Sequence, residues 1–455
     1  QHIYRQTIGV FVLPLIPPFI HEKAQSGQRS GQIEACALFA DMAGFTAMTE
    51  QLMDKGIEGA EILSSLLNNY FSPILKIIVD HGGMVTTFAG DALTALFPIH
   101  TKKQTEAASK EILRVFLKKC DYPLSVKIGL GAGNVSWGIV EGQSASCYYF
   151  RGQAIDNATE AEKSCFPGEI VCHNSFDELL NKKSKSSFGP IKESFKKDIV
   201  CRFQPRTVID ASFGGEFRTV IPVFISFKQA ESAKETEAFI SAVLTLTQKY
   251  GGHFNLLDFG DKGATILLLF GAPIAHEDLT RRALSCIYEI VGNANIPVRA
   301  GVTHGQVFAG MVGSPLRCTY TSLGNTVNLA ARLMMKAEFG QVLLDEPTAK
   351  QCRHFHLTFN SALSLKGMKK PVPSFILGKR HSQLFHTFKN KLVGRAKDID
   401  KLNHCLGNEK NKIIIVQGGA GIGKSRLIDH AMSCRKELEM WLWFNCDKII
   451  GGSFH

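Results

Sequence analysis

Apolar positions near the start of the chain follow two different periods, which predict a buried strand and then a long helix. Residues 33–40 form a largely apolar run followed by Gly44, so we expect a buried strand that ends in a turn. Residues 59–81 carry apolar side chains at the spacing of one helix face. We expect that helix to end at Gly82, because glycine is the preferred residue just beyond a helix C-terminus.

The pattern that follows completes an α+β module. Short apolar runs at 84–88 and 92–97 flank Gly90 and predict a β-hairpin. A helix is expected over 103–119, then a strand over 124–131 and a further hairpin. This β-α-β-β-α-β order is typical of the ferredoxin-like class.

The chain repeats this pattern once, at a distance of about 170 residues. Three segments recur in the same order: Gly82-Gly83 as Gly251-Gly252, 127–133 as 299–305, and 152–158 as 324–330. The last two segments are also equally spaced in both copies. Gly129 and Gly152 are 23 residues apart, and so are Gly301 and Gly324. Matched spacing of this kind indicates two copies of one module.

The predicted organisation has six parts. They are an N-terminal segment at 1–32, a first module at 33–175, a linker at 176–218, a second module at 219–378, a basic linker at 379–391 and the start of a third element at 392–455. Residues 176–215 are rich in lysine, serine and glycine, which predicts a linker. The lysine clusters at 182–197 and 366–391 are typical of solvated connectors.

Composition narrows the class of protein. The chain has 455 residues, a formal net charge of +11, 45% hydrophobic and 20% charged residues, which excludes disordered and fibrous classes. We expect no membrane span, since no uninterrupted apolar stretch reaches about 18 residues. The scattered cysteines are typical of reduced thiols in a cytoplasmic protein. The basic clusters lie in the linkers without interleaved aromatic residues, so we predict no nucleic-acid partner.

The two copies differ at acidic positions. Copy one has Asp41 at the end of its first strand and Asp91 in the hairpin turn. In copy two Ser226 stands in the place of Asp41, and no carboxylate keeps the position of Asp91. Paired carboxylates supply the hard oxygen ligands that Mg²⁺ prefers, so copy one is the candidate metal-binding half.

Copy two instead carries an amide and a guanidinium. Asn328 and Arg332 are four residues apart on a predicted helix and therefore share one face, whereas copy one has Asp156 and Glu160 at these positions. Such donors suit the charge that builds up on a transferring phosphoryl group. Neither copy has both sets. One complete site requires the copies to pair head-to-tail about a pseudo-twofold axis within the chain, which would also create a second, defective site.

These segments resemble the class III nucleotidyl cyclases. Residues 39–46 and 88–93 look like the family's two metal-aspartate motifs, and 324–332 looks like its transition-state motif. Tandem cyclase halves followed by an NTPase module are similar to the soluble, bicarbonate-responsive adenylyl cyclases and their bacterial relatives. The resemblance implies two cyclase domains of ferredoxin-like fold.

The resemblance also implies conversion of ATP to cyclic AMP and pyrophosphate with two Mg²⁺ ions, or Mn²⁺ in their place. In the matching positions, the metal ligands are Asp41, Met42 and Asp91, and the catalytic residues are Asn328, Arg332 and Lys127. The substrate-binding positions are Met42, Ala43, Gly44, Phe45, Thr46, Gly90, Leu256 and Thr321.

Three positions depart from the family pattern, one in base recognition and two in anion control. Adenine-selective members carry a lysine where this chain has Leu256, while Thr321 matches the family. Thr321 therefore favours ATP over GTP, but with reduced selectivity. The lysine and arginine that bind bicarbonate in the soluble cyclases correspond here to Thr87 and Thr159, so we expect a weak response to bicarbonate or none.

A third element begins after the second module. A strand expected over 412–416 precedes a complete G-x-x-x-x-G-K-[ST] motif, whose phosphate-binding positions are Gly418, Gly423, Lys424 and Ser425. This motif predicts a second nucleotide site at the start of a P-loop NTPase domain of the AAA-like type. Thirty residues follow Ser425, so we expect no complete hydrolytic site within this chain.

Three functions remain open on sequence grounds. The leading prediction is an adenylyl cyclase with one composite site between the two modules. A catalytically weak module that binds ATP and regulates the NTPase element is the second, and Leu256 is its main support. A guanylyl cyclase is third, because no carboxylate is in place to read guanine.

Overall fold

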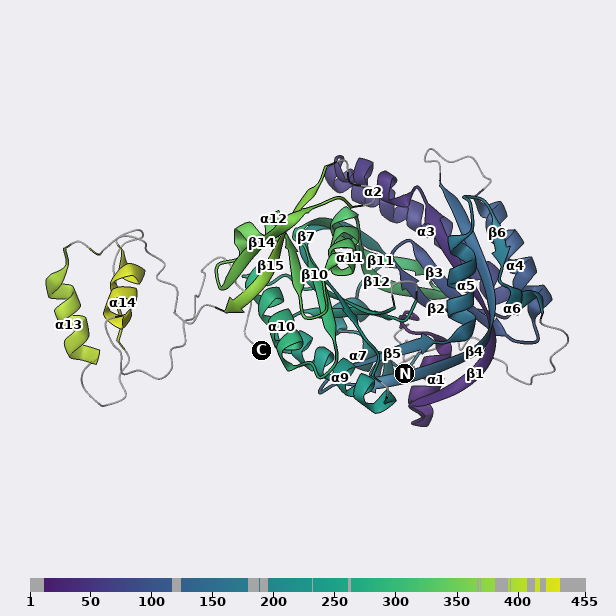
Figure 1. The fold of residues 1–455 in the computed structure, drawn as a ribbon, viewed down its shortest axis with the longest axis horizontal. Helices are drawn as coiled ribbons and strands as arrows, with labels where there is room; N and C mark the ends of the chain where they lie inside the picture. The colour runs from purple at the N-terminus through teal and green to yellow at the C-terminus, as the bar shows by residue number, and fades with distance from the viewer. Residues whose placement is uncertain are drawn as a thin grey trace, which may run out of the picture. The chain divides into compact units, whose positions relative to one another are not determined.

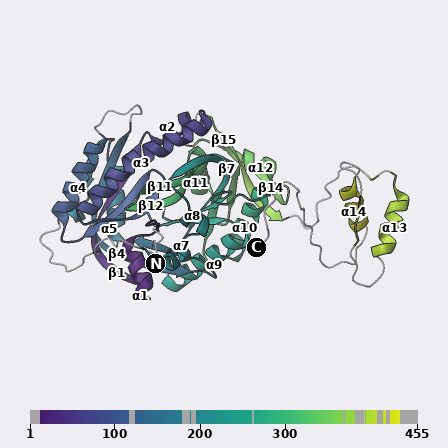
Figure 2. The same cartoon turned by 180° about the vertical axis from the view of Figure 1, so that it is seen from behind.

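The computed structural model describes most of the chain in two compact units, Gln1–Lys379 and Arg380–His455 (Figures 1 and 2). The described residues are 12–116, 124–178, 188, 195–230, 232–260, 263–365, 368, 370–380, 392, 394–406, 414–417 and 423–433.

The first module is a sheet with helices, as predicted. Its elements are α1 (Pro18–Ser26), β1 (Ser30–Ala43), α2 (Phe45–Met53), α3 (Gly56–Asp80), β2 (Met84–Ala89), β3 (Ala92–Pro98), α4 (Lys102–Val115), β4 (Ser125–Glu141), β5 (Ser146–Arg151), α5 (Gln153–Lys163), β6 (Ile170–Cys172) and α6 (Asn174–Asp177). The strand order is β2-β3-β1-β4-β5, with β6 parallel to β4. The β1-α3-β2-β3-α4-β4 succession confirms the predicted element order, and the sheet is mixed.

The second module repeats this arrangement. Two short helices, α7 (Lys197–Phe203) and α8 (Arg206–Ile209), precede β7 (Gly214–Phe227), α9 (Ala233–Lys249), β8 (His253–Asp258), β9 (Ala264–Phe270), α10 (Leu279–Asn293), β10 (Val298–Val302), β11 (Gly305–Ser314), β12 (Arg317–Leu323), α11 (Asn325–Lys336), β13 (Val342–Asp345), α12 (Glu346–Gln351), β14 (Phe355–Leu363) and β15 (Val372–Arg380). Strand β7 takes the place of β1, while β10 and β11 together take the place of β4. The strand β7 begins at Gly214, five residues before the predicted module boundary.

The two modules pack against each other inside the first unit. Helix α3 of the first module contacts β7 and β11 of the second, and α9 of the second contacts β4 and β5 of the first. The equivalent strands β2 and β8 also contact each other. One buried cluster joins Phe71 to Phe308 and Val312, and another joins Tyr149 to Ile240. The hydrophobic core is therefore shared between the modules, and burial of this surface stabilises the pair.

The described part of the predicted linker is not a solvated connector, and the sequence-based expectation is wrong for residues 195–209. Ile199, Val200 and Phe203 on α7 are buried in the same cluster as Leu15 of the N-terminal segment. The backbone N–H of Lys196 also donates to Nε2 of the buried His21, at 2.9 Å. The reason is that the apolar face of α7 packs inward although lysines flank it, a helix-periodic signal that composition alone does not reveal.

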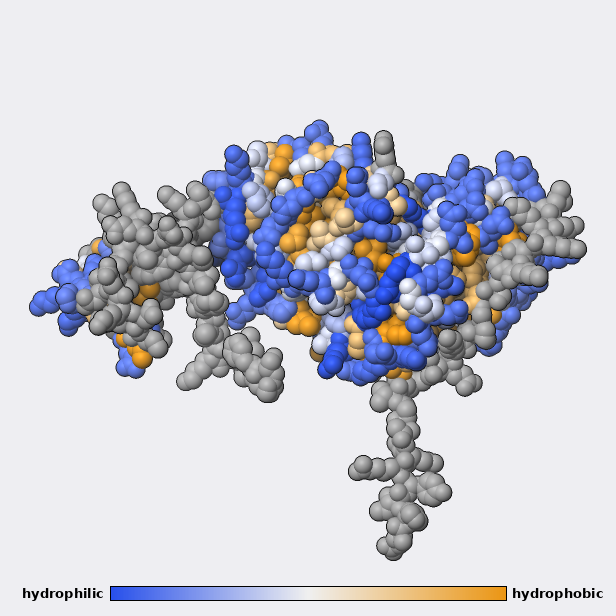
Figure 3. All heavy atoms as spheres, turned by 90° about the horizontal axis from the view of Figure 1, so that it is seen from below, coloured by the Kyte–Doolittle hydropathy of each residue, from blue (hydrophilic) through white to orange (hydrophobic). Residues whose placement is uncertain are grey.

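Helix α3 is long and apolar enough to cross a membrane by length and composition alone, although its sequence has no uninterrupted apolar run. Ten of its residues are buried, and it contacts β7 and β11, so it is placed as a core helix. On the face in Figure 3, apolar patches are small and separated by polar residues. Large exposed apolar side chains are scattered: Ile57 lies on α3, Phe166 in the segment between α5 and β6, and Phe359 on β14.

A buried histidine in β8 makes the stability of this unit dependent on pH. Burial lowers the pKa of His253 to about 4, and its Nε2 has no hydrogen-bond partner among the described residues. The unfolded chain binds a proton at this histidine below about pH 6.5, whereas the folded chain does not, so stability falls as the pH drops from 6.5 towards 4.

We expect His253→Met to remove part of this acid sensitivity, since the equivalent position in the first module is the buried Met84. The free energy of unfolding at pH 4 relative to pH 7 should improve by about 3 kcal/mol in the variant. Urea unfolding at several pH values measures it. An identical pH dependence in the variant and the parent would contradict the assignment.

The second unit contains two described helices, α13 (Ala396–Leu406) and α14 (Lys424–Ser433). They pack through Leu402, Leu427 and Ala431. Residues 414–416, predicted as strand, are irregular in the structure, and 412 and 413 lie outside the described residues. A strand requires a hydrogen-bonded neighbour, and none pairs with 414–416 in the part of the unit that is described.

Candidate active site

The two predicted metal-binding aspartates lie next to each other because of the sheet register. Asp41 of β1 pairs with Ala92 of β3, so Asp91 directly precedes the partner of Asp41. Gly90 has φ +72°, which permits the tight turn between β2 and β3 that presents Asp91. Both carboxylates are half-buried. The register therefore brings two hard oxygen donors together at one sheet end.

At the two equivalent positions, the second module carries no carboxylate. Ser226 pairs with Thr265 and Arg299, as Asp41 pairs with Ala92 and Lys127, so Ser226 is the structural equivalent of Asp41. By the same register, the equivalent of Asp91 is the buried Ala264. Among the described residues, these two positions carry carboxylates in the first module and not in the second.

The turn after Asp41 leads straight into a helix N-terminus. Met42 is buried, Ala43 ends β1, and Gly44 has φ +93° and caps α2. No side chain caps this end, so the first backbone N–H groups of Phe45 and Thr46 are directed at the space before the helix. Such groups favour an anionic oxygen. The side chain of Thr46 lies outside the described part of the structure.

Lys127 lies opposite Asp41 in the β1–β4 pairing. Its Nζ is 3.1 Å from Oε1 of Glu162 on α5, and both side chains are largely buried. Burial by itself lowers the pKa of Lys127, but the hydrogen bond and charge of Glu162 and the charge of Asp41 outweigh burial and raise it. Lys127 is therefore a fixed ammonium beside the carboxylate pair.

Asn328 and Arg332 lie one turn apart on α11, both half-buried. The Nη1 of Arg332 is buried and has no hydrogen-bond partner among the described residues. A buried guanidinium donor left without an acceptor is costly unless a ligand supplies one. This observation fits an anionic phosphoryl group at this position.

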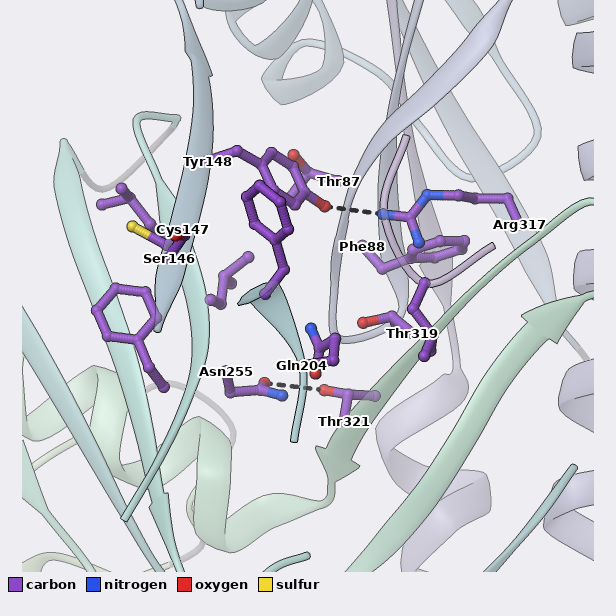
Figure 4. Close-up of a pocket in the computed structure, with 15 residues that line it drawn as sticks. Thr87, Phe88, Ser146, Cys147, Tyr148, Gln204, Asn255, Arg317, Thr319 and Thr321 are labelled. Atoms are coloured by element: carbon purple, nitrogen blue, oxygen red, sulfur yellow. Dashed lines mark hydrogen bonds between the residues drawn. The ribbon is translucent and has the colours of Figure 1, made fainter. Parts of the chain in front are cut away.

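A pocket between the modules holds the two predicted base-reading residues (Figure 4). It is lined from β2, β5, β8 and β12, and also from the N-terminal segment and α7; the lining residues are Leu15, Thr87, Phe88, Ser146, Cys147, Tyr148, Phe203, Gln204, Phe254, Asn255, Leu256, Leu257, Arg317, Thr319 and Thr321. Leu256 and Thr321 are thus brought together. Asp41, Asp91, Lys127, Asn328 and Arg332 are not among the lining residues.

Asn255 is a polar residue of this pocket that the sequence analysis missed. It lies at a β-bulge between Phe254 and Leu256, where its Oδ1 accepts from the hydroxyl of Thr321 at 3.3 Å. Its Nδ2 donates to the carbonyl of Tyr320 at 2.7 Å. A bulge directs an extra side chain to one face, and no alternation pattern in the sequence signals it.

Arg317 was also missed. It is buried over the ring of Phe88, and its Nη2 donates to the hydroxyl of Tyr148 at 2.8 Å (Figure 4). It therefore brings a cation into the pocket that Thr87 lines. Thr159, the other position at which we noted a missing cation, is buried on α5 and donates to the carbonyl of Ile155.

The predicted P-loop lies partly within the described residues. Gly423 has φ +90° and Lys424 begins α14, as expected at the end of a P-loop, while Gly418 and the side chain of Ser425 lie outside the described residues.

No group of three or more His, Cys, Asp and Glu side chains suited to a metal occurs in the described ranges. The nine cysteines in those ranges are free thiols.

The chain resembles known cyclases in part of its sequence and in its fold. Residues 234–379 match the adenylate and guanylate cyclase catalytic domain. A solved class III adenylyl cyclase-like ATP-binding protein from Pseudomonas aeruginosa shares the fold, with a TM-score of 0.54 over 71% of this chain and 86% of that one at 12% identity. Residues 234–379 therefore resemble a cyclase catalytic domain, and the chain has a class III cyclase-like α+β fold with mixed sheets.

Within that class, the chain is similar to adenylate cyclase type 10. It is 26% identical to the rat protein over 488 residues and 26% identical to the human protein over 498 residues. Each match covers 86% of this chain but 30% of the relative. The chain therefore spans about a third of the length of these relatives.

Proposed function

We propose that the chain is an adenylyl cyclase that converts ATP to 3′,5′-cyclic AMP and pyrophosphate at one composite site. The similarity to adenylate cyclase type 10 supports this proposal, as does the cyclase catalytic domain match. The observation that carries it is the complementary division of groups at equivalent described positions. The first module has Asp41 and Asp91 where the second has Ser226 and Ala264, and the second has Asn328 and Arg332 where the first has Asp156 and Glu160.

The two modules form this site by head-to-tail pairing about a pseudo-twofold axis. The reciprocal contacts of α3 and α9 with the opposite module support such an axis, as does the meeting of the equivalent strands β2 and β8. A second, defective site then follows at the symmetry-related position, where Ser226 replaces Asp41 and Asp156 replaces Asn328.

Divalent metal fits the first module's half of the site. Asp41, Asp91 and the backbone carbonyl of Met42 would hold two Mg²⁺ ions, or Mn²⁺, by hard oxygen ligation. When bound, these ions would make the ribose 3′-hydroxyl more acidic and offset triphosphate charge. Phosphate oxygens of the nucleotide would complete the coordination.

The remaining groups bind and orient the nucleotide. Backbone N–H groups at the start of α2 cradle phosphate oxygens, and Gly90 leaves room for the nucleotide next to the β2–β3 turn. Lys127 contacts the triphosphate and Asn328 orients the ribose. Arg332 donates to the phosphorus oxygens as negative charge builds up during in-line attack, and its Nη1, unpartnered among the described residues, is available for this contact.

A product assay tests the proposed function. The purified chain is incubated with Mg²⁺ or Mn²⁺ and either ATP or GTP, and the cyclic nucleotide is identified by mass spectrometry. Cyclic AMP as the main product supports the proposal. Cyclic GMP alone would indicate a guanylyl cyclase, and nucleotide binding without any product would indicate a regulatory ATP-binding module.

That regulatory module is the second candidate, and Leu256 favours it. Leu256 lines the pocket beside Thr321 and offers no hydrogen bond to an adenine nitrogen. The polar neighbours, Asn255 and Thr321, already bond to each other and to a backbone carbonyl. Base binding is therefore weaker than in a site with a lysine donor. The P-loop of the second unit would be the target of such regulation.

We expect Leu256→Lys to improve ATP recognition. A hydrogen bond from a charged donor contributes about 1.5 to 3 kcal/mol, so KM for ATP should fall about tenfold or more relative to that for GTP. The matched control is Leu256→Met, which keeps an apolar side chain of similar size without a donor and should leave KM for ATP unchanged. Equal effects of both variants, or no effect of Leu256→Lys, would contradict the base-site assignment.

A further inference from the structure

Three charged side chains lie together at the edge of the proposed metal site. Lys127 is opposite Asp41 in the sheet and 3.1 Å from Glu162, so one ammonium has a carboxylate on either side. The Glu162 side chain is 10% exposed and that of Lys127 is 26% exposed, so water screens this ion pair less than an exposed one. Glu162 has no role in the proposed mechanism.

Close packing of α5 on β4 fixes where Glu162 lies. A Cβ on Gly129 would be 2.0 Å from the carbonyl oxygen of Ala158 and 2.5 Å from the backbone nitrogen of Glu162. The helix backbone therefore rests directly on the strand, two residues beyond Lys127. This contact holds the Glu162 carboxylate within reach of the Lys127 ammonium.

The second module shows the same packing with different chemistry. A Cβ on Gly301 would be 2.1 Å from the Ala330 carbonyl oxygen and 2.4 Å from the backbone nitrogen of Met334, so Met334 is the structural equivalent of Glu162. Arg299, the equivalent of Lys127, has Ser226 opposite it. With neither place taken by a carboxylate, Arg299 donates to the carbonyls of Met335 and Ala337 at the end of α11. The carboxylate of Glu162 is therefore a feature of the metal-binding half alone.

We propose that Glu162 is a positioning residue that holds Lys127 and so prevents its ammonium from neutralising Asp41. Asp41 then keeps its charge available for a divalent cation, and Lys127 remains beside the site for the triphosphate. This inference rests on the proposed function, because it takes Asp41 as a metal ligand. Once Glu162 is removed, the carboxylate that still attracts the ammonium is Asp41.

Binding of Mn²⁺ to the nucleotide-free chain tests the inference directly. Free Mn²⁺ is followed by electron paramagnetic resonance for the parent chain and for Glu162→Gln, which keeps the shape and removes the charge. We expect Mn²⁺ binding to weaken about three- to tenfold, the range of a partly screened ion pair. Glu162→Met, which introduces the residue found at the equivalent position of the second module, should weaken Mn²⁺ binding to a similar extent. Thermal unfolding checks that both variants fold.

A double-variant cycle separates action through Lys127 from a direct effect of Glu162 on the cation. In a Lys127→Met background, Glu162→Gln should change Mn²⁺ binding by less than about twofold, because the ammonium is gone. An equal loss in both backgrounds would overturn the inference. Unchanged Mn²⁺ binding in Glu162→Gln would also overturn the inference. That result is expected if the freed Lys127 donates to carbonyls at the end of α5, as Arg299 does at the end of α11.

Cyclase activity distinguishes failure of the inference from failure of the proposed function. Cyclic AMP formation by the parent, together with unchanged Mn²⁺ binding in Glu162→Gln, overturns the inference and leaves the proposed function standing. The predicted Mn²⁺ pattern without any cyclic nucleotide overturns the function and supports the role of Glu162. If Asp41→Asn also binds Mn²⁺ like the parent, the metal assignment and the inference both fail.

Discussion

Replacing Asp41 by asparagine is expected to lower the rate of cyclic AMP formation by at least about a thousandfold, because ligation of metal to a phosphoryl group contributes several kcal/mol. The substitution keeps the size of the side chain but removes the negative charge that attracts the cation. Asp41 is the residue tested because the strand register places it next to Asp91 at one end of the sheet. Initial rates at saturating ATP and several Mg²⁺ concentrations measure the effect.

The second module supplies the matched control. Ser226 has the same sheet partners as Asp41 by register, so Ser226→Ala changes the equivalent position of the proposed defective site. We expect it to leave the rate within about twofold, as for a substitution outside the reacting groups. If Asp41→Asn retains a tenth or more of the parent rate, or if both variants lose activity alike, the composite-site assignment is wrong.

The element order could be predicted because each segment carries its own periodic signal. The helix expected at 59–81 is observed at Gly56–Asp80, and it ends where Gly82 adopts φ +80°. The hairpin strands expected at 84–88 and 92–97 are observed with similar bounds. The prediction failed for α7, because lysine-rich composition there outweighed a short apolar face that only tertiary packing makes decisive.

The candidate site was predictable only where the two copies could be compared. Ser226 against Asp41 and Glu160 against Arg332 are differences that stand out once the repeat is aligned. Asn255 gave no such signal, since its place in the pocket depends on a β-bulge. The same comparison could have drawn attention to Glu162, because the aligned residue is Met334. What it could not reveal is the ion pair with Lys127, which depends on how closely α5 rests on β4.

Removing the guanidinium of Arg332 is expected to lower kcat about 100- to 1000-fold with a smaller change in KM, the loss typical of a donor that acts on transition-state charge. Its Nη1 is buried and unpartnered among the described residues, so it is poised to meet an oxygen that gains charge during the reaction. Arg332→Ala tests the loss, and Arg332→Lys keeps the charge but not the planar pair of donors, so it should recover little of the rate.

Glu160→Ala is the matched control for this prediction, because Glu160 holds the equivalent position on α5 and its side chain is 74% exposed. We expect its kcat to stay within about twofold of the parent, since an exposed side chain remote from the reacting groups contributes little. Steady-state kinetics with MgATP, read beside thermal unfolding of each variant, separates lost chemistry from lost folding. A fall in kcat of less than tenfold for a folded Arg332→Ala, or a rise in KM alone, would mean that Arg332 binds the ground state and that another donor stabilises the phosphorus oxygens.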